Sequence, residues 1–108
     1  MELISEIYEK TKEYKYIKEI NLSRSLDSEE GLLYDMKLVF SKFPYEYDSF
    51  SILFEGVQDI HLSDLNNCLA VAIKIEDISS YQLEGVHFKV DEVGEELFSF
   101  YCKNITIV

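Results

Sequence analysis

The stretch VAIKIEDISSYQLEGVHFKVDEV, residues 71–93, decides the fold of this chain. In two runs of it, residues 71–75 and 86–90, every second residue is apolar. This period of two is typical of β-strands that bury one face. The polar connection between the runs contains Asp77 and Ser79, either of which can cap one helical turn. The stretch therefore predicts two strands joined by a structured crossing.

The same alternation continues on both sides and predicts the rest of a sheet. A turn at residues 27–31, with Gly31 free to adopt a positive φ, makes the first two runs a hairpin. A third run ends near Gly56 and is followed by a separate short strand. In the last run the apolar parity slips, which predicts a β-bulge near Lys103 and Asn104. The predicted strands cover residues 16–26, 34–40, 50–54, 60–62, 68–75, 86–90 and 97–108.

The first dozen or so residues have a helical period instead. Leu3, Ile4, Ile7 and Tyr8 fall on one stripe, which predicts an amphipathic helix. The sequence thus predicts an α+β fold: an N-terminal helix followed by a six- or seven-stranded, mostly antiparallel sheet, curled or sandwich-like. We expect one domain, 1–108, because a chain of 108 residues with 47% hydrophobic residues can form a core without metals or disulfides.

Charge is distributed unevenly along the chain. The formal net charge is −11, yet residues 1–24 contain five acidic and five basic residues and are neutral. The whole imbalance therefore lies in residues 25–108. A field of this sign disfavours nucleic acid and anionic membranes as partners, and it attracts cations or a basic protein. The alternative is an acidic surface that only keeps the protein soluble.

No residue pattern specifies an enzyme or a cofactor. The histidines, His61 and His87, have no recognisable nucleophile or acid beside them, and the four glycines are too far apart for a phosphate-binding loop. One group of metal-ligand types occurs within ten residues, and Asp59 and His61 in it share strand parity. It lacks a second His or Cys, so a solvated strand face is the preferred interpretation. The group consists of Glu55, Asp59, His61 and Asp64.

Two segments are candidates for a protein-binding surface. The first is a turn crowded with carboxylates, where like charges repel unless water or a partner screens them. The second is a connection in which tyrosines alternate with acids, residue types that are common at interfaces. Either segment can instead be a solvated turn or pack on the core. The candidate residues are Tyr45, Glu46, Tyr47, Asp48, Glu84, Asp91, Glu92, Glu95 and Glu96.

Several features predict a cytoplasmic protein. The start, MELISE, lacks the basic and apolar regions of a signal peptide. The longest apolar run, residues 68–73, is too short to span a bilayer. Cys68 and Cys102 are expected to be reduced, buried thiols, although a disulfide between them is possible.

The run EDISSYQLEGV, residues 76–86, followed by FSFYC at residues 98–102, resembles a family of small bacterial proteins linked to polymorphic-toxin loci. These are regarded as immunity proteins. The resemblance covers residues 50–108 and lies in the pattern of strands and turns. It implies a cytosolic protein that binds and blocks a toxin domain, and an acidic surface would suit a basic nuclease. The alternatives are a small-molecule or metal-binding module and an assembly domain whose acidic surface is only solubilising.

Overall fold

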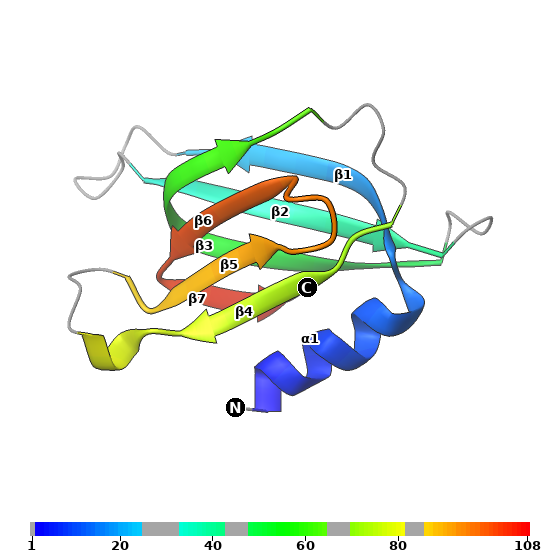
Figure 1. Ribbon diagram of the computed structural model, residues 1–108, viewed down its shortest axis with the longest axis horizontal. Helices are drawn as coiled ribbons and strands as arrows, with labels where there is room; N and C mark the ends of the chain where they lie inside the picture. Colours follow the sequence, from blue (N-terminus) through cyan, green and yellow to red (C-terminus); the bar gives the residue numbers. More distant parts are fainter. Residues whose placement is uncertain (1, 25–32, 43–47, 65–69, 82–85) are drawn as a thin grey trace.

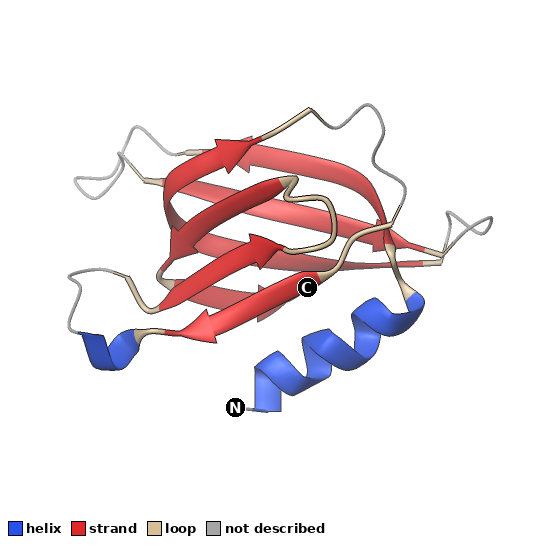
Figure 2. Ribbon diagram, viewed as in Figure 1, coloured by secondary structure: helices blue, strands red, loops and turns tan. Residues whose placement is uncertain are grey.

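The computed structural model describes residues 2–24, 33–42, 48–64, 70–81 and 86–108 (Figures 1 and 2). It confirms an α+β fold with an N-terminal helix and a seven-stranded antiparallel sheet that is not closed. The predicted turn at 27–31 lies outside the described residues. The elements are α1 Glu2–Glu13, β1 Tyr16–Ser23, β2 Tyr34–Ser41, β3 Ser49–Leu62, β4 Ile73–Asp77, the 3-10 helix η1 Ser79–Tyr81, β5 Phe88–Glu92, β6 Phe98–Cys102 and β7 Asn104–Ile107.

The strands follow the order β1-β2-β3-β6-β5-β4, and β7 also pairs with β3. β7 pairs with the first half of β3, from Ile52 to Glu55, and β6 pairs with the second half, from Gln58 to Leu62. β6 and β7 are therefore two halves of one run that is interrupted at Lys103. The break lies where the slip in apolar parity predicted an irregularity.

β3 corrects one sequence prediction. The third strand does not end near Gly56 but continues to Leu62, so the separate short strand at 60–62 does not exist. Gly56 has a φ of 67°, and a Cβ there would lie 3.0 Å from the Cβ of Lys103. Glycine lets the strand bend at this point without ending, because it adopts positive φ at little cost. The bend directs the second half of β3 toward β6 (Figure 1).

One hydrophobic core is formed by the inward faces of the strands and by α1. The rings of Phe54 and Phe100 meet edge to face with centroids 5.0 Å apart, and Phe98 stacks on Phe100. The expected shared face of Phe98, Phe100 and Cys102 is confirmed, since all three are buried. Burial raises the pKa of the Cys102 thiol to about 12, so it is an unreactive free thiol. Cys68 lies outside the described residues.

α1 covers the exposed backbone of the edge strand β4 (Figure 1). Ile7 is fully buried in the core. The Tyr8 hydroxyl donates a hydrogen bond to the carbonyl oxygen of Ile75 at 3.0 Å and accepts one from the Ile75 amide at 2.8 Å. An unpaired edge invites pairing with other chains, and the helix blocks it at this residue.

The crossing between β4 and β5 contains the predicted helical turn. The Asp77 carboxylate accepts hydrogen bonds from the Ser79 amide at 3.0 Å and the Ser79 hydroxyl at 2.6 Å. These bonds hold the pKa of Asp77 below its usual value. Of the expected strand at 68–75, residues 68 and 69 lie outside the described residues, and among the others β4 begins at Ile73, since the amide of Ala72 bonds to the Glu92 side chain.

The core position of Phe100 gives a first prediction. Phe100→Ala should lower the free energy of unfolding by about 3–5 kcal/mol, because the ring is buried in the core against Phe54 and Phe98. Denaturant melts measure this loss. The control is Val93→Ala, a change at an exposed residue, which should alter the free energy of unfolding by no more than about 0.5 kcal/mol. A loss below about 1 kcal/mol for Phe100→Ala would contradict the packing described here.

The Tyr8 hydroxyl gives a second prediction. Tyr8→Phe should cost about 1–2 kcal/mol, because both backbone groups of Ile75 lose their partner at a part-buried position. Tyr101→Phe is the matched control, since that hydroxyl has no hydrogen bond among the described residues. Equal unfolding midpoints for the two variants would show that the helix does not stabilise the edge in this way.

Candidate functional site

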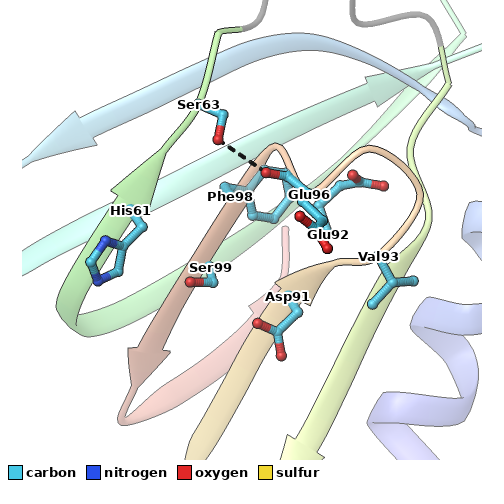
Figure 3. Close-up of a pocket in the computed structure, with 8 residues that line it drawn as sticks. All are labelled: His61, Ser63, Asp91, Glu92, Val93, Glu96, Phe98 and Ser99. Carbon is cyan, nitrogen blue, oxygen red and sulfur yellow. Dashed lines mark hydrogen bonds between the residues drawn. The ribbon is translucent and has the colours of Figure 1, made fainter.

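A cleft of about 370 Å³ lies between the second half of β3 and the turn that joins β5 to β6 (Figure 3). We call residues 91–96 the acidic turn. The cleft contains carboxylates, hydroxyls, one imidazole and two apolar side chains. Its lining residues are His61, Ser63, Asp91, Glu92, Val93, Glu96, Phe98 and Ser99.

Strand register places three of these residues in one row across the sheet. Ser99 of β6 pairs with His61 of β3 on one side and with Asp91 of β5 on the other. All three lie on the outward face, opposite Phe98 and Phe100 (Figure 3). Such rows bring side chains from distant parts of the sequence side by side.

A bulge in β3 is what puts His61 on that face. Asp59 has a φ of 51°, and the pairing with β6 shifts between Gln58 and His61. The extra residue means that Gln58 and His61 face the same way, although they are three apart. Asp59 and His61 are both exposed, as alternation predicts, but a register shift lies between Gln58 and His61, so regular alternation is not what orients them.

Glu92 is not on a solvated turn, as the sequence indicated, but is 2% exposed. It continues the inward face of β5 after Phe88 and Val90. One carboxylate oxygen accepts the amides of Ala72 and Gly94, both at 2.8 Å. The other oxygen accepts the amides of Glu95 at 2.7 Å and Leu97 at 3.3 Å. This side chain thus fixes the acidic turn to the segment before β4.

The ionised form of Glu92 is favoured by these bonds. Burial alone would raise the pKa of its carboxyl, but the four backbone amides outweigh burial and hold the pKa below the usual value. The carboxylate is satisfied by amide dipoles and has no cation paired with it among the described residues. It therefore leaves a negative charge beneath the wall of the cleft.

The other acids of the turn point to solvent. Asp91 is half-buried, and Glu95 and Glu96 are exposed. None of the three forms an ion pair with a residue in the described ranges. The backbone of Glu96 adopts a φ of 55°, and its carbonyl oxygen accepts a hydrogen bond from the Ser63 hydroxyl at 3.1 Å (Figure 3). The charges are thus held at the mouth of the cleft.

Asp48 has a different environment. Its carboxylate accepts a hydrogen bond from the Tyr14 hydroxyl at 2.9 Å and lies 3.3 Å from the Lys42 ammonium, which also contacts Glu13. The Tyr14 hydrogen bond, followed by Lys42, holds the pKa of Asp48 below its usual value. These contacts join α1 to the ends of β2 and β3. The other candidates in this group, Tyr45, Glu46, Tyr47 and Glu84, lie outside the described residues.

Comparison with known protein families identifies the family of this chain. The family model described as immunity protein PIM8 matches residues 1–108. The chain belongs to the PIM8 immunity protein family. No curated protein and no solved structure matches it.

Membership in the PIM8 family indicates a toxin protein as the partner and a non-enzymatic role. It confirms the resemblance to immunity proteins, and the match extends it from residues 50–108 to the whole chain. The cleft is consistent with this role. His61, Ser99 and Asp91 are residue types of a hydrolase triad, but Ser99 stands between the other two, whereas a triad needs the histidine in the middle.

The remaining candidates form no further centre. Within the described ranges no three His, Cys, Asp or Glu side chains are arranged to hold a metal ion, so Glu55, Asp59, His61 and Asp64 are not brought together. The Nδ1 atom of His87 lies 3.1 Å from the carbonyl oxygen of Lys103. No described helix is long and apolar enough to cross a membrane.

Sequence reasoning missed four residues of the cleft. Ser99 follows from strand parity, since it alternates with buried phenylalanines and must face outward. Ser63, Val93 and Phe98 have no such signal, because the cleft depends on the bulge in β3 and on the conformation of the acidic turn. The PIM8 chain thus builds its cleft from backbone irregularities.

The buried carboxylate of Glu92 gives a third prediction, which concerns how the stability of the fold depends on pH. Because its folded-state pKa is depressed, its contribution to stability is complete above the unfolded pKa of about 4.5 and is lost as pH falls through the lower folded value. Glu92→Gln should lower the free energy of unfolding at pH 7 by about 2 kcal/mol or more, since a Gln amide turns N–H groups toward amide donors. Its stability should fall less than that of the natural chain between pH 5 and pH 3.

Urea melts at pH 7, 5, 4 and 3 measure both effects. Glu95→Gln is the matched control, because it removes a neighbouring charge that is exposed and makes no described contact through its side chain. Parallel pH profiles for Glu92→Gln and the natural chain would contradict the role of this carboxylate.

Proposed function

We propose that this PIM8 family member neutralises a basic toxin domain by direct protein–protein contact, and that the acidic turn and its cleft form part of the contact surface. The observation that carries the proposal is a turn with three carboxylates free of ion pairs in the described structure, held in place by the buried Glu92. Fixed charges of one sign favour a partner of the opposite sign.

The placement of the lysines supports this surface. Lys12 pairs with Glu9, and Lys42 pairs with Glu13 and Asp48, all around α1 and the β2–β3 end. Beside the acidic turn, Lys74 lies across from Asp91 on β4 but makes no ion pair with it in the described structure, so the three carboxylates of the turn keep no salt-bridged partner there. The net charge of −11 adds a long-range field that steers a basic partner toward the protein.

The second segment of the proposed surface is the connection with Tyr45, Glu46, Tyr47 and Asp48, together with Glu84. Asp48 supports it through its contacts to Tyr14 and Lys42, which anchor the end of this connection to α1. The tyrosines have the residue type of interface anchors.

A small-molecule site is the alternative function for the same cleft. Its volume of about 370 Å³ is at the low end for such sites. Those sites are mostly apolar, whereas five of the eight residues that line this cleft carry a carboxylate or a hydroxyl. The lining therefore favours a polar protein contact.

The fourth prediction tests the proposed partner. Glu95→Lys with Glu96→Lys should slow association with the toxin domain that this protein neutralises at least tenfold at low salt, because attraction becomes repulsion. Association of the natural chain should weaken as salt rises toward 0.5 M, since the Debye length is about 10 Å at 0.1 M. Stopped-flow kinetics measure both effects.

The control is Glu6→Lys with Glu19→Lys, which makes the same change of net charge on α1 and β1. It should slow association less, because those residues are outside the proposed surface. Circular dichroism establishes that both variants fold. Equal rates for all three proteins would place the interface elsewhere, and a toxin domain that does not bind the natural chain would end the proposal.

A further inference from the structure

The cleft offers an apolar surface and several carboxylates. A side chain that is only apolar or only polar could not make favourable contacts with both. One wall is apolar and is formed mainly by Val93, which is 52% exposed, because Phe98 is only 3% exposed. Ser99 lies on β6 between His61 of β3 and Asp91 of β5, and the side chains of Asp91 and Glu96 also belong to the lining (Figure 3). An apolar wall that leads to carboxylates matches a long side chain with an apolar stem and a polar end.

The charges around the cleft have one sign. Glu92 lies behind the wall as an ionised, buried carboxylate, and a buried charge is screened less than an exposed one. Asp91 is the strand partner of Lys74 on β4, yet the two make no ion pair among the described contacts. The one basic-type side chain in the lining is His61, on the opposite rim. The lining therefore carries three carboxylates and no lysine or arginine, and Lys74 lies next to it on β4.

This combination selects the class of occupant. An acidic side chain would be repelled, and an apolar one would desolvate carboxylates without pairing them. A lysine or arginine satisfies both features, because its methylene stem can cover Val93 while its charged end donates to carboxylate and hydroxyl oxygens.

We infer that the cleft receives one lysine or arginine side chain of the partner, with its stem on Val93 and its cationic group between Asp91 and Glu96. This inference rests on the proposed function and names the anchor of that contact. A partner side chain bound in the cleft is removed from water. Loss of its contacts should therefore raise the dissociation rate more than it lowers the association rate.

The first experiment is a kinetic comparison at 0.15 M salt with the same toxin domain as in the fourth prediction. Asp91→Asn with Glu96→Gln removes the two carboxylates and keeps their shapes. Glu6→Gln with Glu19→Gln removes two charges on α1 and β1 and is the matched control. Both pairs should slow association by a similar small factor, and only the cleft pair should speed dissociation at least tenfold.

The second experiment uses the free protein and a probe of known chemistry. Nα-acetyl-arginine amide, added at millimolar concentration, should shift the amide NMR signals of Val93, Glu96 and Ser99. Nα-acetyl-citrulline amide has nearly the same shape without the charge and should shift them at least tenfold less. The response to the arginine probe should disappear in the Asp91→Asn, Glu96→Gln variant.

Each result has a distinct meaning. Equal dissociation rates for the two variant pairs, with the toxin still bound, would overturn the anchor and leave the proposed function intact. Equal responses to the arginine and citrulline probes would overturn it as well, in favour of a general polar-ligand site. Absence of toxin binding by the natural chain would overturn the proposed function, and the probe experiment would still decide whether the cleft selects a cationic side chain.

Discussion

The continuity of β3 is the constraint on which the rest of the structure depends. This strand pairs with β2, β7 and β6, so every other strand is attached to it directly or through one of these three. It can serve both halves of the sheet only because it bends at Gly56, where a side chain would approach Lys103, and shifts register at Asp59. The first irregularity lets the sheet turn around its core, and the second sets His61 at the rim of the cleft. Fold and site therefore share one cause.

The sequence predicts well the features that depend on local periodicity. The N-terminal helix, the helical turn after β4, the irregularity at Lys103 and the inward face of β6 all follow from patterns of two or 3.6 residues. The features it misses depend on contacts between distant residues. Nothing near Gly56 in the sequence indicates that the strand continues beyond it, because the evidence is the approach of Lys103, 47 positions later.

Glu92 is the residue where composition is most misleading. It stands among Asp91, Glu95 and Glu96, and a count of charges assigns all four the same exposed role. Strand parity separates them, because Glu92 alone continues the inward face of Phe88 and Val90. A carboxylate is stable in that position only if it finds donors, and the amides of Ala72, Gly94, Glu95 and Leu97 supply them. The donors are backbone amides. Nearly every residue has one, so the sequence does not show which of them bind Glu92.

This arrangement also explains how the acidic turn tolerates its own repulsion. Carboxylates held close together destabilise a fold unless something compensates them, and a mobile turn would spread them apart. Here the Glu92 carboxylate ties both sides of the turn by hydrogen bonds, and the Ser63 hydroxyl binds the Glu96 carbonyl from β3. The turn is therefore ordered before any partner arrives, and binding would not have to order it. The same Glu92 hydrogen bonds that order the turn also stabilise the fold at neutral pH, so rigidity of the binding surface and stability of the fold depend on one ionised carboxylate.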